Sequence, residues 1–211
     1  MTKELLEIYK NKKWEIRKRL DEFKSVINLS DEKLFVELAF CILTPQSKAT
    51  TSWNAIQALD RNNLLLSGTE KEILPFLQAI RFGETKSKRI VTNRKLFIEN
   101  GKLKIKDKLS NMDAHELRGW LVENIDGYGM KEASHFIRNV GLSDNKLAIL
   151  DRHILRNLKE LGVIDDMPKS LTKKKYLEIE EKMKGFSRKI GVMMDELDLL
   201  LFFKETGMIF K

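Results

Sequence analysis

Apolar side chains recur at helical spacing along almost the whole length of this 211-residue chain. In residues 34–42, for example, the apolar positions 34, 35, 38, 39 and 42 fall on one face of a helix. The chain holds only three prolines, and few runs alternate β-branched with polar residues as strands do. The pattern therefore predicts an all-α fold, and no apolar run approaches the ~20 residues of a membrane span.

Capping signals give the expected ends of these helices. Ser30 suits the N-cap of one helix, and Thr69 with Glu72 fits a capping box at the start of another. Gly101 and Gly141 suit the position just after a helix C-terminus. Besides the helix that starts at the capping box, helices are expected over residues 3–26, 31–43, 48–60, 86–100, 114–124, 131–140, 151–161, 172–185 and 190–205.

Charge and cysteine content narrow the class of protein. Lys and Arg outnumber Asp and Glu by 39 to 31, a formal net charge of +8. Such a field attracts polyanions such as a nucleic-acid backbone, although solvated lysines would give the same count. The single cysteine, Cys41, lies in an apolar run where burial is expected, and it excludes intrachain disulfides and four-cysteine zinc or iron–sulfur sites. With only three histidines besides, no protein metal site is expected.

Several other side chains have a structural interpretation from their spacing. His135 follows the apolar periodicity of its helix and is expected to be structural. Trp14, Trp53 and Trp120 lie at amphipathic positions, which predicts a place in the core. The basic residues of helix 86–100 form either a phosphate-facing surface or a solvated one, and they are Lys86, Lys88, Arg89, Arg94 and Lys95.

Residues 125–131, Ile-Asp-Gly-Tyr-Gly-Met-Lys, are the most informative motif for function. Gly127 and Gly129 flank one residue, which lets the backbone turn sharply between two helices and approach a phosphate closely. Lys131 then opens the second helix, and Asp151 follows twenty residues later. An ordinary turn between helices with a surface lysine would carry the same glycines. The aspartate and the net charge favour chemistry on a nucleotide.

A lysine amine beside a carboxylate suits the chemistry of a deoxyribose. A neutral amine that attacks C1′ displaces the base and leaves an iminium, and this makes the adjacent C2′ proton acidic. Loss of that proton expels the 3′ phosphate by β-elimination. Asp151 would stabilise the positive charge that develops at C1′ and on the ring oxygen. It is also well placed to cap a helix, and the two roles are compatible.

The chain resembles the helix-hairpin-helix DNA glycosylase superfamily, and within it the second family of archaeal and bacterial 8-oxoguanine DNA glycosylase/AP lyases. Three segments carry the resemblance: residues 43–47 (LTPQS), 129–136 (GMKEASHF) and 204–211 (KETGMIFK). Together with the helices between them, the similarity covers most of the chain. It implies a two-lobed helix-hairpin-helix fold with the active site in the cleft between the lobes.

The order and length of the expected helices suggest how the chain divides. Residues 30–124 are expected to form a lobe of the six-helix type that ends in the entry helix of the hairpin. Residues 125–161 then supply the helix-hairpin-helix and the loop of the catalytic aspartate, and residues 1–29 pack with 162–211 as a second helical lobe. The interval between Lys131 and Asp151 is about two residues longer than in the family.

Each matching position acquires an expected role from the resemblance. Lys131 is the nucleophile that forms the Schiff base, and Asp151 is its carboxylate partner. Gln46 fills the gap left by the flipped nucleotide or contacts the orphaned base. Phe202, where the family more usually has tryptophan, stacks on the flipped base. Lys211 forms part of the base pocket.

The hairpin and its surroundings are expected to bind DNA. Gly127, Gly129 and Met130 lie where the family grips the backbone, and His153 orients the active site or packs against it. The resemblance also implies that the hairpin can hold a monovalent cation between its carbonyls and a DNA phosphate. No other cofactor and no metal are expected.

Recognition of 8-oxoguanine depends on its N7 hydrogen, because guanine has an acceptor at N7. A pocket acceptor that faces guanine would stay unpaired, which costs ~1–3 kcal/mol. Asp198, four residues before Phe202 and so on the same helical face, is the hypothesis for this acceptor; a solvated or salt-bridged aspartate is the alternative. Phe82 is either the second wall of the base sandwich or a core residue.

The expected function is therefore a bifunctional glycosylase/AP lyase that excises 8-oxoguanine through Lys131. Its partner is double-stranded DNA that contains 8-oxoguanine, with no membrane and no obligate protein partner. We expect a cytoplasmic monomer that is nucleoid-associated when bound to DNA. Two alternatives remain: the same fold acting on another damaged base, and a helix-hairpin-helix DNA-binding module without activity.

Overall fold

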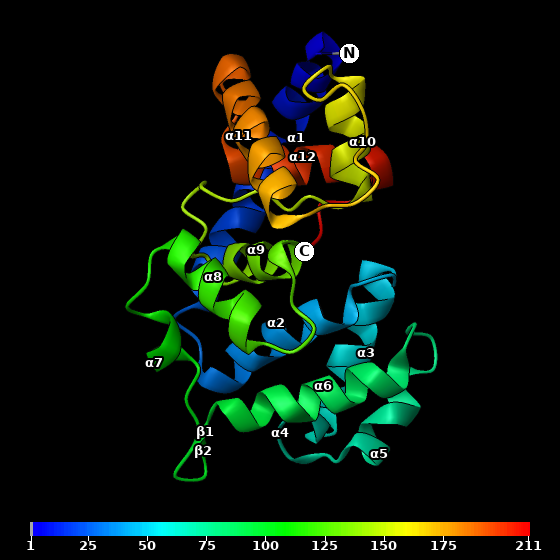
Figure 1. The fold of residues 1–211 in the computed structure, drawn as a ribbon, viewed down its shortest axis with the longest axis vertical. Coiled ribbons are helices and arrows are strands. Elements are labelled where there is room, and N and C mark those ends of the chain that lie inside the picture. Colours follow the sequence, from blue (N-terminus) through cyan, green and yellow to red (C-terminus); the bar gives the residue numbers. More distant parts are fainter. Residues whose placement is uncertain (1) are drawn as a thin grey trace.

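The structure is a computed structural model that describes residues 2–211, and it is almost entirely helical (Figure 1). The all-α prediction is confirmed. The elements are α1 (Thr2–Val26), α2 (Asp31–Leu43), α3 (Ala49–Arg61), α4 (Leu64–Ser67), α5 (Glu70–Ile73), η1 (Leu74–Leu77), α6 (Gly83–Leu96), β1 (Ile98–Glu99), β2 (Lys102–Leu103), α7 (Lys106–Leu109), α8 (Ala114–Asn124), α9 (Met130–Asn139), α10 (Arg152–Glu160), α11 (Lys173–Ile190) and α12 (Met194–Thr206). Within residues 2–211 no helix is long and apolar enough to cross a membrane.

The helices pack around two hydrophobic clusters. The first cluster takes its buried residues from Leu34 to Leu147 and includes most of α2. The second cluster joins the apolar face of α1 to residues from Ala148 to Leu201. Figure 1 shows the corresponding arrangement, with α10, α11 and α12 in the upper half and α2 to α6 in the lower half. The chain passes from one cluster to the other between α9 and α10, immediately before Asp151.

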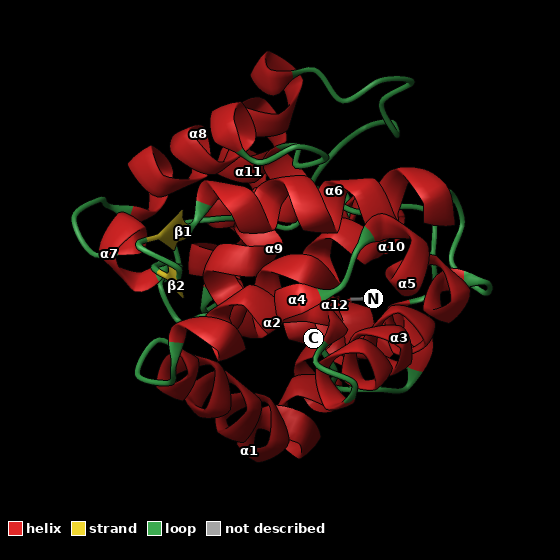
Figure 2. Ribbon diagram, turned by 90° about the horizontal axis from the view of Figure 1, so that it is seen from below, coloured by secondary structure: helices red, strands yellow, loops and turns green. Residues whose placement is uncertain are grey.

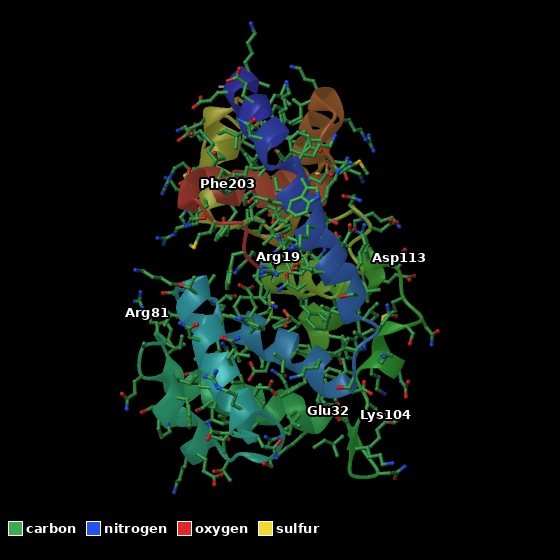
Figure 3. All side chains as sticks on the ribbon, turned by 180° about the vertical axis from the view of Figure 1, so that it is seen from behind. Arg19, Glu32, Arg81, Lys104, Asp113 and Phe203 are labelled. Carbon is green, nitrogen blue, oxygen red and sulfur yellow. The ribbon has the colours of Figure 1, made fainter. Side chains whose placement is uncertain are left out.

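Helix α1 makes the N-terminus part of the second cluster. Its buried residues Leu5, Tyr9, Ile16 and Phe23 share one face at helical spacing, and this face packs on α12. Glu196 of α12 accepts a hydrogen bond of 2.6 Å from the Tyr9 hydroxyl. Figure 3 shows α1 from behind, running from the upper group of helices, which carries Phe203, down towards the lower one, which carries Arg81. The expected division of the chain into residues 30–124, residues 125–161, and residues 1–29 with 162–211 stays a prediction.

The expected end of the helix over residues 86–100 was wrong. Helix α6 stops at Leu96 instead of continuing to Gly101, and a two-stranded antiparallel hairpin follows. Asn100 and Gly101 form its turn with φ of 51° and 75°. A type I′ turn between strands needs positive φ at both central positions, and Asn-Gly is one of the pairs that adopt it most readily. Figure 2 shows these short strands beside α7 as the only yellow elements among the described residues.

Two expectations about surface and core were also wrong. Trp14 is 72% exposed instead of buried, with the ammonium of Lys18 above its ring. Lys86 and Arg94 of α6 are buried, so they cannot face a phosphate. Arg94 instead donates hydrogen bonds to the carbonyls of Leu65 and Gly68, at 3.0 and 2.9 Å.

Candidate active site between the two hydrophobic clusters

A cavity of about 820 Å³ opens where the two clusters meet. Five parts of the chain line it: the loop and first turn at residues 44–50, Arg81 before α6, the inward face of α9, residues 149–154, and α12 with the segment that follows it. Lys131, Asp151 and Phe202 all lie in this lining. A volume of this size is typical of a pocket for a small ligand or a single base.

The glycine hairpin connects α8 to α9 and places Lys131 in the first turn of α9. Gly127 has a φ of +92°, and a Cβ there would lie 2.7 Å from the side chain of Arg89, so the position requires glycine. Asn93 of α6 holds the turn through two hydrogen bonds of 2.9 Å to the backbone of Asp126. The hairpin geometry therefore depends on α6 as well as on the two helices that it joins.

Lys131 lines the cavity and is 22% exposed. Its ammonium lies 3.0 Å from a carboxylate oxygen of Glu132, and the other Glu132 oxygen accepts a hydrogen bond from the backbone N–H of Gly129. The lysine is thus paired with its neighbour in sequence. Gly127, Gly129 and Met130 shape the approach to α9 and are not among the residues that line the cavity.

Asp151 is the N-cap of α10 and also lines the cavity. Its Oδ1 accepts a 2.8 Å hydrogen bond from the backbone N–H of Ile154. Capping uses one carboxylate oxygen, so the second can face a ligand. The structure therefore confirms the capping role of Asp151 and places the residue in the cavity lining.

Helix α11 fixes the backbone that leads to Asp151. The Tyr176 hydroxyl donates to the carbonyl of Ala148 at 2.6 Å, and Glu180 accepts from the Ala148 N–H at 2.7 Å. Glu180 also forms a buried bidentate ion pair with Arg118 of α8, at 2.6 and 2.8 Å. Because Arg118 adjoins the first cluster and Glu180 the second, this pair ties the clusters together beside the active site.

The interval between Lys131 and Asp151 contains a tight turn. Asp144 and Asn145 have positive φ of 49° and 56°, and Asp195 of α12 accepts hydrogen bonds from Ser143 and Asn145. These contacts fix the turn before the chain enters the second cluster.

Phe202 offers its ring to the cavity from the last turns of α12. The ring of His153 meets it edge-on, with centroids 6.1 Å apart and an interplanar angle of 87°. The Nδ1 of His153 lies 3.4 Å from Glu205 of the same helix as Phe202. The structure thus places His153 as a support for the ring that is expected to stack on the base.

Asp198 lies one helical turn before Phe202 and lines the same cavity. Its Oδ2 lies 2.5 Å from Nη1 of Arg138, which is buried on α9. Burial raises the pKa of Asp198 to about 7, although Arg138 opposes the rise. Asp198 is therefore salt-bridged, and its Oδ1 has no hydrogen-bond partner among the residues of the described chain.

His135 is more than the packing residue expected from its periodicity. It lies one turn after Lys131, it lines the cavity, and it is only 6% exposed. Neither of its ring nitrogens has a hydrogen-bond partner within residues 2–211. Burial lowers its pKa well below the usual value, so the ring is neutral near pH 7. A neutral imidazole with two free nitrogens can donate one hydrogen bond and accept another.

The ammonium of Lys211 is held in a cage of side chains from the first cluster. It forms an ion pair with Glu37 of α2, and it lies 3.8 Å from the ring centroid of Trp53 on α3. Burial lowers the pKa of Lys211, while Glu37 opposes the shift. The segment after α12 therefore crosses from the second cluster to the first and closes one side of the cavity.

Gln46 lies at the tip of the loop between α2 and α3, with an exposed side chain and a φ of 56°. Exposed basic residues surround the same mouth of the cavity, and they are Lys48, Arg81 and Arg152. Phe82 differs from both expectations. It is 54% exposed, with the Arg81 guanidinium near its ring, and it is neither a core residue nor part of the cavity lining.

No role at the site was predicted from the sequence for His135 and Arg138, which line the cavity, or for Glu37, which holds Lys211. His135 and Arg138 follow Lys131 at i+4 and i+7, so the helical face of the lysine could have indicated them. Glu37 gave no local signal, because its partner Lys211 is 174 residues away. Within the described residues, no group of three His, Cys, Asp or Glu side chains could hold a metal ion.

Comparisons with known proteins agree with this geometry. Residues 16–192 match the family model described as 8-oxoguanine DNA glycosylase. The 8-oxoguanine DNA glycosylase/AP lyase of Fusobacterium nucleatum is 48% identical over 99% of this chain and 96% of its own length. The protein of that name from Methanocaldococcus jannaschii is 39% identical over 93% of this chain and 91% of its own.

Two solved structures have the same fold. The 8-oxoguanine DNA glycosylase of Thermotoga maritima superimposes with a TM-score of 0.87 at 34% identity, over all of this chain and 98% of that one. The Methanocaldococcus jannaschii 8-oxoguanine glycosylase/lyase in complex with a 15mer DNA containing 8-oxoguanine gives 0.89 at 36% identity, over all of this chain and 99% of that one. With the hairpin lysine and the capping aspartate in one cavity, the chain belongs to the 8-oxoguanine DNA glycosylase family.

Proposed function

We propose that this protein is a DNA N-glycosylase and abasic-site lyase that excises 8-oxoguanine from duplex DNA and then cleaves the strand by β-elimination. The observation that carries the proposal is the meeting of Lys131 and Asp151 in one cavity of suitable size for a base. Relatives that match nearly the whole chain are named for this activity. The flipped base enters the cavity, because its C1′ cannot be reached inside the duplex.

The chemistry begins when the free amine of Lys131 attacks C1′ of the damaged nucleotide. The glycosidic bond breaks and its electron pair leaves with the base, which gives a C1′ bonded to both the lysine nitrogen and O4′. The nitrogen lone pair then breaks the C1′–O4′ bond, O4′ takes up the proton that the amine loses, and a Schiff base links Lys131 to the opened sugar. The C2′ proton is then lost, and the electrons that bound it expel the 3′ phosphate. Asp151 stabilises the positive charge that develops at C1′ during the first step. Lys131 supplies the nucleophile, so the reaction requires no cofactor.

The base pocket is assigned to residues of α12 and the segment that follows it. Phe202 stacks on the flipped base, and Asp198 accepts the N7 hydrogen of 8-oxoguanine through the oxygen that Arg138 does not hold. Lys211, fixed by Glu37 and Trp53, keeps the wall of the pocket in place. At the duplex, Gln46 fills the gap left by the flipped nucleotide or contacts the orphaned base, and its exposed position supports this role.

Replacing Asp198 with asparagine is expected to lower the preference for 8-oxoguanine over guanine by roughly tenfold, since an unpaired buried acceptor costs ~1–3 kcal/mol. Because the pKa of Asp198 is about 7, excision by the wild type should fall as the pH drops through 7 and the acceptor is protonated. Excision by the asparagine variant should not show this decrease at low pH. Single-turnover excision from pH 5.5 to 8.5 measures both effects.

Asp195→Asn is the matched control for this prediction. Asp195 is on the same helix and is held by Ser143, but it is not part of the cavity lining. Its variant should lose stability without losing selectivity. Wild-type rate and selectivity in Asp198→Asn would show that Asp198 serves only as the partner of Arg138.

Borohydride trapping on duplexes with different lesions tests the proposed function itself. We expect a covalent adduct with 8-oxoguanine and with an abasic site, and none with undamaged guanine. An adduct with another damaged base but not with 8-oxoguanine would support the same fold acting on that base. The absence of an adduct with every lesion would support a non-catalytic DNA-binding module.

We also infer that the protein acts as a monomer on double-stranded DNA, without an obligate protein partner, because one chain supplies every group of the cavity. Its net charge of +8 supports binding to the DNA backbone, and we infer a cytoplasmic enzyme that is nucleoid-associated when bound and has no membrane partner. The backbone carbonyls of the glycine hairpin would hold a monovalent cation against a DNA phosphate, and no chemical step depends on it.

A further inference from the structure

Lys86 is a buried lysine without a carboxylate partner. It lies on α6, it is 2% exposed, and within residues 2–211 its ammonium forms no ion pair within 4.0 Å. Burial lowers its pKa to about 8. A buried ammonium is costly unless its hydrogen bonds are satisfied. The acceptors of the Lys86 ammonium therefore indicate the role of this residue.

All three acceptors of Lys86 belong to the end of α2 and the loop that follows. The ammonium donates to the carbonyls of Leu43 and Pro45, at 2.8 and 2.7 Å, and to the hydroxyl of Ser47 at 3.3 Å. Carbonyls at a helix C-terminus lack partners within the helix and carry partial negative charge, so a cation is favoured there. Lys86 thus supplies a hydrogen-bond donor to a carbonyl at the C-terminus of α2. It also contacts Pro45 and Ser47, the residues on either side of Gln46.

Gln46 lies between these anchored residues in a backbone conformation that it would rarely adopt unaided. Its φ of 56° is in the left-handed region, where a residue other than glycine is strained and persists only when its surroundings enforce it. The Ser47 hydroxyl also accepts a hydrogen bond of 3.2 Å from the backbone N–H of Arg81, which fixes the far end of the loop to the turn before α6. The contacts that hold Gln46 in this backbone conformation are those of Lys86 and Ser47 with the loop.

We propose that Lys86 is a positioning residue that holds Gln46 in its strained, exposed conformation so that Gln46 can enter the duplex when the damaged nucleotide flips out. Lys86 itself is too deeply buried to contact DNA. The inference rests on the role proposed above for Gln46. It assigns to α6 a function in lesion capture that is separate from the chemistry of Lys131.

A comparison of two substrates separates positioning from general damage to the fold. Excision of 8-oxoguanine from a duplex needs the gap to be filled, whereas cleavage at an abasic site in a single-stranded oligonucleotide does not. We expect Lys86→Met, which keeps the length but removes the donors, to lower the ratio of duplex excision to single-strand cleavage by about tenfold or more, since small misplacements can cost up to ~100-fold. Ser47→Ala removes one acceptor and should lower the ratio less.

A double-mutant cycle with Gln46→Ala completes the test. If Lys86 acts through Gln46, Lys86→Met should have little further effect on duplex excision when Gln46 is already alanine. Fully additive losses, or equal losses on both substrates, would overturn the inference and leave Lys86 as a stabilising residue. Should Lys86→Met fail to fold, the same cycle with Ser47→Ala decides. Wild-type excision by Gln46→Ala would refute the role of Gln46, while trapping on 8-oxoguanine would still establish the enzyme's activity.

Discussion

Replacing Lys131 with glutamine is expected to abolish the borohydride-trapped adduct and to lower strand cleavage at 8-oxoguanine by about 10³-fold or more. Glutamine keeps a polar side chain at this position but has no amine that could form a Schiff base. The variant should still fold, because Lys131 is partly exposed and its ion pair with Glu132 is of the kind that contributes ~0–1 kcal/mol. Trapping, single-turnover cleavage and thermal unfolding measure the three effects.

Lys175→Gln is the matched control for this variant. The ammonium of Lys175 lies 3.0 Å from Glu178, the same distance as in the Lys131–Glu132 pair, but on α11 and outside the cavity. Its loss should leave trapping unchanged. An adduct that persisted in Lys131→Gln would instead place the nucleophile at Lys48 or Lys211, the other lysines that line the cavity.

Features that depend on local periodicity could be predicted from the sequence. The helices, the capping box at Thr69 and the turn that presents Lys131 all follow from residues within a few positions of one another. The β-hairpin turn at Asn100–Gly101 also has a local signal, the Asn-Gly pair itself. The helical pattern before it masks this signal, because the pattern predicts a helix that continues to residue 100.

The contacts that assemble the cavity could not be predicted in the same way. Arg118 and Glu180 are 62 residues apart, and Arg138 and Asp198 are 60 apart. Nothing in a single sequence pairs these charges, because any buried arginine could be satisfied by any nearby carboxylate once the helices have packed. The burial of Lys86 was missed for the same reason, since its acceptors are backbone carbonyls on another helix.

Replacing Asp151 with asparagine is expected to lower excision of 8-oxoguanine by about 10² to 10³-fold while the fold stays intact. The loss reflects removal of the negative charge that stabilises the sugar as the base departs. Asparagine is as good an N-cap as aspartate, so the bond to the N–H of Ile154 can be kept. The midpoint of thermal unfolding should therefore change little.

The step at which the rate falls distinguishes charge stabilisation from a general defect. Cleavage at a preformed abasic site involves no departing base, so Asp151→Asn should slow it much less than it slows excision. Single-turnover rates on duplexes with 8-oxoguanine and with an abasic site provide this comparison. Asp113→Asn is the control, because Asp113 caps α8 in the same way but lies outside the cavity.

Asp151→Ala separates the two roles of the aspartate from each other. Alanine removes both the charge and the cap, so it should show the same loss of excision as asparagine and a further loss of about 1 kcal/mol in the free energy of unfolding. If the asparagine variant excised 8-oxoguanine at the wild-type rate and only the alanine variant were impaired, Asp151 would act through the position of α10 alone. The charge that opposes the developing cation would then have to come from Glu132 or Asp198, the other carboxylates that line the cavity.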